Sequence, residues 1–304
     1  MRHAILGPGG VGGLIGALLA DAGEDVTLIV RPGTESLYPH EISLESPFKT
    51  LHAPVSVSAA LKSSLDVLWV TVKATELELA LESIPTDFRI NAIVPLLNGI
   101  DHVERCASDS VVTASYRRPS RWRANASRRG RIVHRSRFIR FSILETGRRL
   151  LASPLETFQR FGFECLSVAD EPTLMWSKLV FLAPLALSTS AEKSPIGDVL
   201  SHPIKAARLE ASVHEACAVA TQAGARVSAD SVLAKIKTLP VAMRSSMERD
   251  IANGKLPELE AIAGPILRGA EGFRIELKAI PELVRDIQSI VSGQQVGKVV
   301  LHNE

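Results

Sequence analysis

The sequence predicts an α/β protein in which an N-terminal, doubly wound parallel sheet is followed by an all-helical C-terminal domain. Short apolar runs alternate with helical patterns in the first half, and long helix-compatible segments separated by Pro and Gly fill the second. A chain of 304 residues exceeds the size at which a single core keeps growing. We therefore expect two domains, 1–168 and 169–304, that meet in the turn-prone stretch SVADEPT.

The first half opens with the apolar run RHAILG, a helix from about Gly10 to Ala22, and a second run, DVTLIV. LDVLWVTVK, a helix around ATELELALESI, and NAIVPLLNG follow. Continuous hydrophobicity is typical of strands buried on both faces, and alternation with helices predicts a parallel sheet. GRIVHRSRFIRFSI alternates instead, so we expect one strand with a single wet face there. TLMWSKLVFLAPLAL, PIKAARLEASVHEACAVATQAG and PELVRDIQSIVSG predict helices in the second half.

Composition excludes several classes of protein. A net charge of +2 shows no polyelectrolyte character that would point to nucleic acid or a membrane surface. Cys106, Cys165 and Cys217 are odd in number and lack CxxC spacing, which argues against a disulfide framework or a zinc site and fits a reducing cytoplasm. No uncharged run reaches the length of about 20 residues that a transmembrane helix needs, so no membrane span is expected. The eight histidines are scattered and the sequence contains no metal-ligand cluster, so no metal site is expected.

The glycine-rich turn after the first apolar run fits the pattern GxGxxG. Gly7, Gly9 and Gly12 occupy its glycine positions, with Gly10 and Val11 at the start of the following helix. A strand before the turn and a helix and second strand after it make a βαβ unit, the Rossmann-type context for dinucleotide binding. Glycines let the main chain approach a pyrophosphate, and helix-start N–H groups bind its oxygens. The alternative is a turn that serves only helix–strand packing.

Three side chains follow strands whose carboxyl ends would border a bound dinucleotide. DVTLIV ends in Arg31, not in the acidic residue that an NAD-preferring unit usually places there, and a guanidinium can pair with a 2′-phosphate. NADP(H) is therefore the favoured cofactor. Lys73 closes VTVK and could contact phosphate or the substrate carboxylate, while Asn98 closes LLNG and could orient the nicotinamide or the substrate. Each has a plain alternative, since arginine and lysine are common at surfaces and Asn-Gly is a turn pair.

The order of these motifs resembles the ketopantoate reductase family (NADPH-dependent 2-dehydropantoate 2-reductases of pantothenate biosynthesis). GPGGVG, a strand ending in Arg31, VTVK, LLNG, WSKL, SSMERD and PELEAIAG follow one another nearly end to end. The resemblance implies a Rossmann-type domain, a helical domain, and reduction of a small 2-oxo acid.

The resemblance also assigns roles to residues that the pattern alone does not single out. Lys178 matches the catalytic lysine and Asn98 the asparagine beside it, while Glu258 matches the glutamate that contacts the substrate. Ser246 matches a serine that helps to hold the substrate, and Asp250 completes its motif. Without the family, Lys178 could equally snorkel from an apolar helix face. Helical domains of this size often pair between subunits, so the chain could form a homodimer.

The sequence departs from the family at two places, one that concerns the substrate and one that concerns a basic stretch. Leu182 and Ala186 stand where the family places asparagines, four and eight residues after the lysine, so a hydroxylated acid would lose hydrogen-bond partners. Residues 116–140 carry ten arginines and no acid where the family has an uncharged strand-loop-strand passage. That stretch could grip phosphates or single-stranded nucleic acid, or form a basic surface insert.

We therefore expect an NADPH-dependent reductase of a 2-oxo acid whose substrate is altered from ketopantoate. The alternative is a non-catalytic NADP(H)-binding protein with a degenerate substrate pocket. Leu182 and Ala186 favour the binding protein, whereas Lys178, Ser246 and Glu258 favour the enzyme.

Overall fold

The computed structural model describes residues 1–102, 106, 114–117, 125–135 and 139–301. These residues form two compact units. Unit 1 comprises Met1–Leu97 and Asp101–Leu174, and unit 2 comprises Asn98–Ile100 and Met175–Glu304. The division along the chain falls inside a long helix, and the short segment 98–100 belongs to unit 2 although the chain on both of its sides belongs to unit 1.

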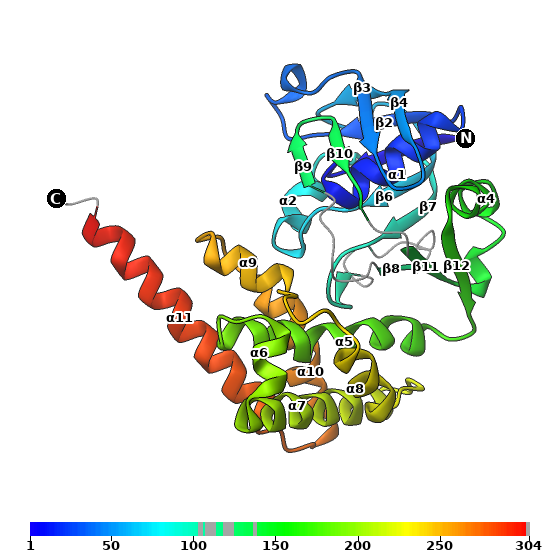
Figure 1. Ribbon diagram of the computed structural model, residues 1–304. Helices are drawn as coiled ribbons and strands as arrows, with labels where there is room; N and C mark the ends of the chain where they lie inside the picture. The colour runs from blue at the N-terminus through cyan, green and yellow to red at the C-terminus, as the bar shows by residue number, and fades with distance from the viewer. Residues whose placement is uncertain (103–105, 107–113, 118–124, 136–138, 302–304) are drawn as a thin grey trace. The chain divides into compact units, whose positions relative to one another are not determined.

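Unit 1 is built on a parallel sheet of five strands in the order β5-β2-β1-β6-β7 (Figure 1). The strands are β1 (Arg2–Leu6), β2 (Asp25–Ile29), β5 (Ser56–Ser58), β6 (Leu65–Val70) and β7 (Ile90–Pro95). The central strands are buried almost throughout, as their continuous hydrophobicity predicts. Helix α1 (Gly10–Asp21) joins β1 to β2, which confirms the expected βαβ unit.

Two smaller sheets complete unit 1. One has the order β4-β3-β10-β9 and the other β12-β11-β8. Their strands are β3 (Glu41–Glu45), β4 (Thr50–Pro54), β8 (Ala114–Arg117), β9 (Asn125–Arg128), β10 (Arg131–Val133), β11 (Ile139–Leu144) and β12 (Phe163–Val168). The remaining elements are η1 (Glu35–Leu37), η2 (Ala74–Glu76), α2 (Leu77–Leu81), η3 (Glu145–Gly147) and α4 (Ala152–Phe161).

The prediction of a single strand over GRIVHRSRFIRFSI is wrong. The stretch forms β10 and β11, which belong to different sheets and have different partners. β10 pairs with β3 and β9, whereas β11 pairs with β12 and β8. The alternation is real in β11, whose residues are buried and half-buried in turn, but pairing over long sequence distances decided where each strand ends.

Unit 2 is helical (Figure 1). Its helices are α5 (Glu171–Ala191, shared with the end of unit 1), α6 (Ile196–Ser201), α7 (Pro203–Gln222), α8 (Ala229–Lys237), α9 (Ser246–Ala252), α10 (Leu259–Phe273) and α11 (Ala279–Leu301). One apolar core joins the inner faces of α5, α7 and α10. α5 is long and apolar enough to cross a membrane, but 72% of its apolar window is buried in the protein, as in the core helix of a folded domain.

Candidate functional site

The turn between β1 and α1 is shaped by its glycines. Gly7 has φ +87°, and a Cβ there would lie 2.5 Å from Cγ1 of Val72. A Cβ on Gly12 would lie 2.7 Å from the carbonyl oxygen of Gly7 and 2.8 Å from Ile5 Cγ2, closer than real Cβ atoms come. Gly12 therefore lets the start of α1 approach β1. Gly9 differs, because no atom of the described residues, its two chain neighbours aside, lies within 4 Å of the position of its Cβ.

The start of α1 has the chemistry that a pyrophosphate requires. Gly9 is the N-cap, and its own N–H donates to the Gly7 carbonyl at 2.7 Å. Gly10, Val11 and Gly12 form the first turn, so their backbone N–H groups have no acceptor within the helix. No acidic side chain lies in this first turn, and no side chain caps the helix. Fixed N–H donors and the positive end of the helix dipole favour an anion here, and the open space at Gly9 lets it approach the backbone. The turn fits the pyrophosphate of a dinucleotide.

Thr71 holds this turn in place, a role that the sequence pattern did not reveal. Its hydroxyl lies 2.7 Å from the carbonyl oxygen of Gly7 and 3.1 Å from that of Leu6. The backbone N–H of Thr71 also donates to the Leu6 carbonyl at 2.9 Å. Thr71 follows β6, the neighbour of β1 in the sheet. The only signal in the sequence was a polar residue directly after a buried strand.

Arg31 and Lys73 lie in unit 1, beyond the ends of β2 and β6. The Arg31 side chain is 73% exposed, and its Nη2 lies 2.5 Å from Oε1 of Glu76, at the end of η2. Lys73 is half-buried and is the N-cap of η2. The structure thus places both expected cations on the unit that carries the glycine turn, and it adds a carboxylate, Glu76, that sequence reasoning missed.

Asn98 and Glu258 are brought together from positions 160 residues apart in the chain. Asn98 Nδ2 donates to Glu258 Oε2 at 2.9 Å. Glu258 is buried and is the N-cap of α10, but its carboxylate does not cap that helix, so it is available to Asn98. Both residues belong to unit 2.

Gly99 makes this pairing possible. Its φ is +82°, a left-handed conformation that glycine adopts without strain. A Cβ there would lie 3.0 Å from the carbonyl carbon of Ala261 and closer still to its oxygen, so the backbone of the Asn-Gly turn packs directly against the first turn of α10. The Asn-Gly turn, which the sequence analysis gave as the plain alternative for Asn98, therefore places Asn98 beside Glu258.

Lys178 lies on α5 in unit 2 and is half-buried. Its neighbours Trp176 and Leu179 are buried in the core of this unit. Leu182, one helical turn after Lys178, is half-buried against the same core, and Ala186 is fully buried. The face of α5 that continues from Lys178 is therefore apolar, without side-chain hydrogen-bonding groups at these two positions.

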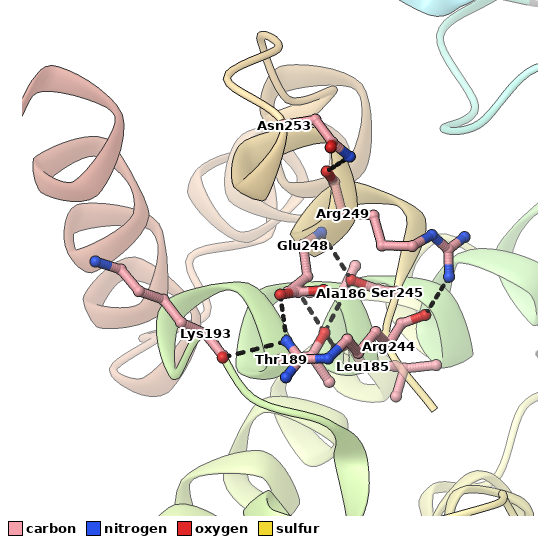
Figure 2. Close-up of polar contacts among 9 residues, drawn as sticks. All are labelled: Leu185, Ala186, Thr189, Lys193, Arg244, Ser245, Glu248, Arg249 and Asn253. Atoms are coloured by element: carbon pink, nitrogen blue, oxygen red, sulfur yellow. Dashed lines mark hydrogen bonds and ion pairs between the residues drawn. The ribbon is translucent and has the colours of Figure 1, made fainter. Parts of the chain in front are cut away.

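Ser246 opens α9, and a polar network ties this short helix to α5 (Figure 2). The hydroxyl groups of Thr189 on α5 and Ser245, the N-cap of α9, are hydrogen bonded at 2.8 Å. Ser245 Oγ also accepts from the backbone N–H of Glu248 at 3.1 Å. Because Ser245 precedes Ser246 directly, these bonds fix the position of Ser246 relative to α5.

Arg244 adds a second tie between the same two helices. Its Nη1 lies 2.5 Å from Oε1 of Glu248, whose side chain is 6% exposed, and 3.3 Å from the carbonyl oxygen of Lys193, just beyond α5 (Figure 2). A buried carboxylate such as that of Glu248 needs a charged partner, and Arg244 is this partner. Asp250, from the same motif as Ser246, lies half-buried further along α9.

The arginine-rich stretch 116–140 lies partly outside the described residues, as do Trp122 and the side chain of Tyr116. Its four arginines with described side chains contact groups of unit 1. Arg131 and Arg135 pair with Glu45, Arg140 with Glu164, and Arg129 lies over the ring of Tyr38. Such local pairing is typical of a basic surface segment.

Within the described part of the chain, no group of three or more His, Cys, Asp or Glu residues could hold a metal ion. Cys106, Cys165 and Cys217 are free thiols, and burial raises the pKa of each to about 11. The thiolate form that would act as a nucleophile is therefore disfavoured at all three positions.

The comparison with known proteins agrees with these features. The family model "Ketopantoate reductase PanE/ApbA" matches residues 3–138, and its C-terminal counterpart matches residues 172–290. An uncharacterized oxidoreductase of Bacillus subtilis, YkpB, is 26% identical over 95% of this chain and 98% of its own length. The 2-dehydropantoate 2-reductase of Archaeoglobus fulgidus is also 26% identical, over 96% of this chain and 98% of its own.

Solved structures show the same fold. A PanE/ApbA family ketopantoate reductase from Ralstonia eutropha superposes with a TM-score of 0.79 at 23% identity, covering 97% of this chain and all of the other. A D-mandelate dehydrogenase, solved with NADH and anilino(oxo)acetate, has a TM-score of 0.79 at 18% identity and covers 96% of this chain and 99% of its own. The two matched models cover most of the sequence in the expected order, and the chain belongs to the ketopantoate reductase family of NAD(P)H-dependent oxidoreductases.

Proposed function

We propose that this protein is an NADPH-dependent reductase of a 2-oxo acid. The observation that carries the proposal is the pairing of Asn98 with Glu258 in unit 2, on a chain whose unit 1 has a glycine turn open to a pyrophosphate at Gly9. The retained Lys178 and Ser246 of the family motifs support it. The free cysteines are consistent with an enzyme of the cytoplasm.

The dinucleotide, when bound, supplies a hydride to the C2 carbonyl of the acid. Negative charge then builds on the carbonyl oxygen, and the Lys178 ammonium is suited to stabilise this charge and donate the proton. Glu258, a buried carboxylate that already accepts from Asn98, orients the polar groups around the substrate. Ser246 binds the substrate from α9, which Thr189 and Ser245 hold against α5.

We assign the cofactor as NADP(H) because Arg31 follows β2, where a Rossmann-type unit contacts the ribose of the adenosine half. A guanidinium there attracts a 2′-phosphate, whereas the carboxylate typical of NAD-specific proteins would repel it. The cofactor's pyrophosphate is bound through the backbone of the glycine turn, by Gly7, Gly9, Gly10, Val11 and Gly12. Lys73 binds a phosphate or the substrate carboxylate, and Asn98 also contacts the nicotinamide.

The substrate that we propose is a 2-oxo acid less polar than ketopantoate. Leu182 and the fully buried Ala186 offer no hydrogen bond where the family has asparagines. A site without partners for a hydroxyl group loses its preference for a hydroxylated acid, and an apolar wall favours a branched or aromatic side chain. The D-mandelate dehydrogenase of the same fold was solved with an aromatic oxo acid amide, anilino(oxo)acetate.

Leu182 and Ala186 also support a second candidate function, a non-catalytic NADP(H)-binding protein.

One experiment distinguishes the reductase from the binding protein. It follows the absorbance of NADPH with the full chain and a panel of 2-oxo acids that includes ketopantoate, a branched aliphatic acid and an aryl acid. The reductase proposal predicts NADPH consumption with at least one acid, most rapid with an apolar one. Tight NADPH binding without consumption for any of them would favour the binding protein.

A further inference from the structure

The arginine that we assign to the 2′-phosphate is already held by a carboxylate. Arg31 Nη2 lies 2.5 Å from Glu76 Oε1, and no intervening atom separates the charges. Both side chains are partly exposed, 73% for Arg31 and 43% for Glu76, so a solute can reach the pair from water.

The two residues follow the strands that flank β1, the strand that leads into the glycine turn. Leu6, the last residue of β1, pairs with Ile29 of β2 on one side and with Val70 of β6 on the other. Arg31 follows β2 closely, and Glu76 ends the short helix η2 that follows β6. The ion pair therefore lies near the carboxyl end of β1, the side on which ligands of such sheets bind.

A 2′-phosphate at Arg31 meets two opposing effects. The guanidinium attracts it, but the Glu76 carboxylate competes for the same N–H donors and repels the phosphate as a like charge. NADH has a ribose hydroxyl at this position, carries no charge there, and leaves the ion pair intact. Glu76 thus penalises one dinucleotide and not the other.

Resting on the proposed function, we infer that Glu76 sets the coenzyme preference of this protein by competing with the 2′-phosphate for Arg31. The protein discriminates between NADPH and NADH less than its arginine alone would allow. Glu76 is a specificity residue that acts through Arg31 and takes no part in the chemical step.

The test measures dissociation constants of the full chain for NADPH and NADH by titration calorimetry, with 2′,5′-ADP and 5′-AMP as probes of the phosphate alone. Glu76→Gln keeps the side-chain size and removes the charge. We expect it to tighten NADPH and 2′,5′-ADP by about threefold to tenfold, the range of an exposed ion pair plus one like-charge contact. NADH and 5′-AMP should change by less than about twofold.

Two controls separate competition from a general charge effect. Glu82→Gln removes a negative charge from an exposed residue just after α2 in the same unit and should change none of the four constants by more than about twofold. In an Arg31→Ala background, Glu76→Gln should tighten NADPH by less than it does in the original protein, because the competition for the guanidinium is gone and only the like-charge repulsion of the phosphate remains.

An opposite result has a clear meaning. If Glu76→Gln weakens NADPH, Glu76 orients Arg31 for the phosphate and the inference is wrong. Equal tightening of NADPH and NADH would also overturn it, since the effect would then not involve the 2′-phosphate. If the unmodified protein binds neither dinucleotide, the proposed cofactor site itself fails, and the inference fails with it.

Discussion

Two glycines of the same turn should respond in opposite ways to the same substitution. At Gly9 the position of a Cβ is open, with no atom of the described part of the chain within 4 Å apart from its chain neighbours, and φ is −79°, which alanine adopts readily. At Gly12 a Cβ would lie 2.7 Å from the Gly7 carbonyl oxygen and 2.8 Å from Ile5 Cγ2. If Gly9 is open for a ligand and Gly12 is closed for packing, Gly9→Ala affects binding and Gly12→Ala affects the fold.

The magnitudes follow from these contacts. Ordinary Cβ contacts begin at 3.4 Å, so Gly12→Ala forces α1 away from β1 by at least about 0.7 Å, an overpacking that typically costs about 1 to 3 kcal/mol. For a unit of this size that lowers Tm by about 2 to 4 °C for each kcal/mol. Gly9→Ala should leave the free energy of unfolding within about 0.5 kcal/mol of the original.

Affinity and stability together separate the two variants, because only Gly9→Ala should weaken NADPH without lowering Tm. A methyl group at Gly9 occupies the approach to the first-turn N–H groups, so NADPH should bind about tenfold to a hundredfold more weakly, corresponding to about 1.4 to 2.8 kcal/mol. The assays are thermal unfolding of each protein without ligand and titration with NADPH. A Gly9→Ala protein that binds NADPH normally would refute the assignment of this turn to the pyrophosphate.

Three further predictions use other parts of the molecule. Gly99→Ala puts a Cβ on a left-handed residue, which costs about 1 to 2 kcal/mol, and pushes Asn98 away from Glu258. We expect kcat to fall and the affinity for NADPH to change less, and an unchanged kcat would contradict this. Arg31→Ala should weaken NADPH about tenfold to a hundredfold and leave NADH unchanged, and equal losses would refute the assignment. Burial lowers the pKa of His3 to about 4 from the usual 6.5, so the unfolded chain binds the proton first and stability is lost as pH falls from 6.5 towards 4. Urea unfolding should show a loss of about 2 kcal/mol between pH 7 and pH 5 that His3→Gln largely removes, and an equal loss in the variant would contradict the assignment.

The parallel sheet and the helical unit were predictable because their signals are local. Continuous apolar runs, a glycine turn and the helix after it lie within a few residues of one another, and β1, α1 and β2 form where they predict. The helices of unit 2 follow apolar periodicity interrupted by Pro and Gly. The family resemblance rests on the same short motifs, and the matched family models confirm it.

Contacts between distant segments were not predictable in the same way. The strand over 130–143 was expected to be single, yet its parts join different sheets through β3 and β12, far away in the chain. The site shows the same limit. Nothing in the sequence pairs Arg31 with Glu76 or Asn98 with Glu258, because each pair meets only after the strands and helices have packed.

The most direct test of the proposed mechanism is Lys178→Ala, assayed for both NADPH binding and turnover with the acid that the unmodified protein reduces. Loss of the ammonium should lower kcat by at least about a hundredfold, since general acid catalysis contributes at least this factor, while the dissociation constant of NADPH stays within about twofold. A variant that reduces the acid at the original rate would show that the proton comes from another group, and the assignment of Lys178 would be wrong.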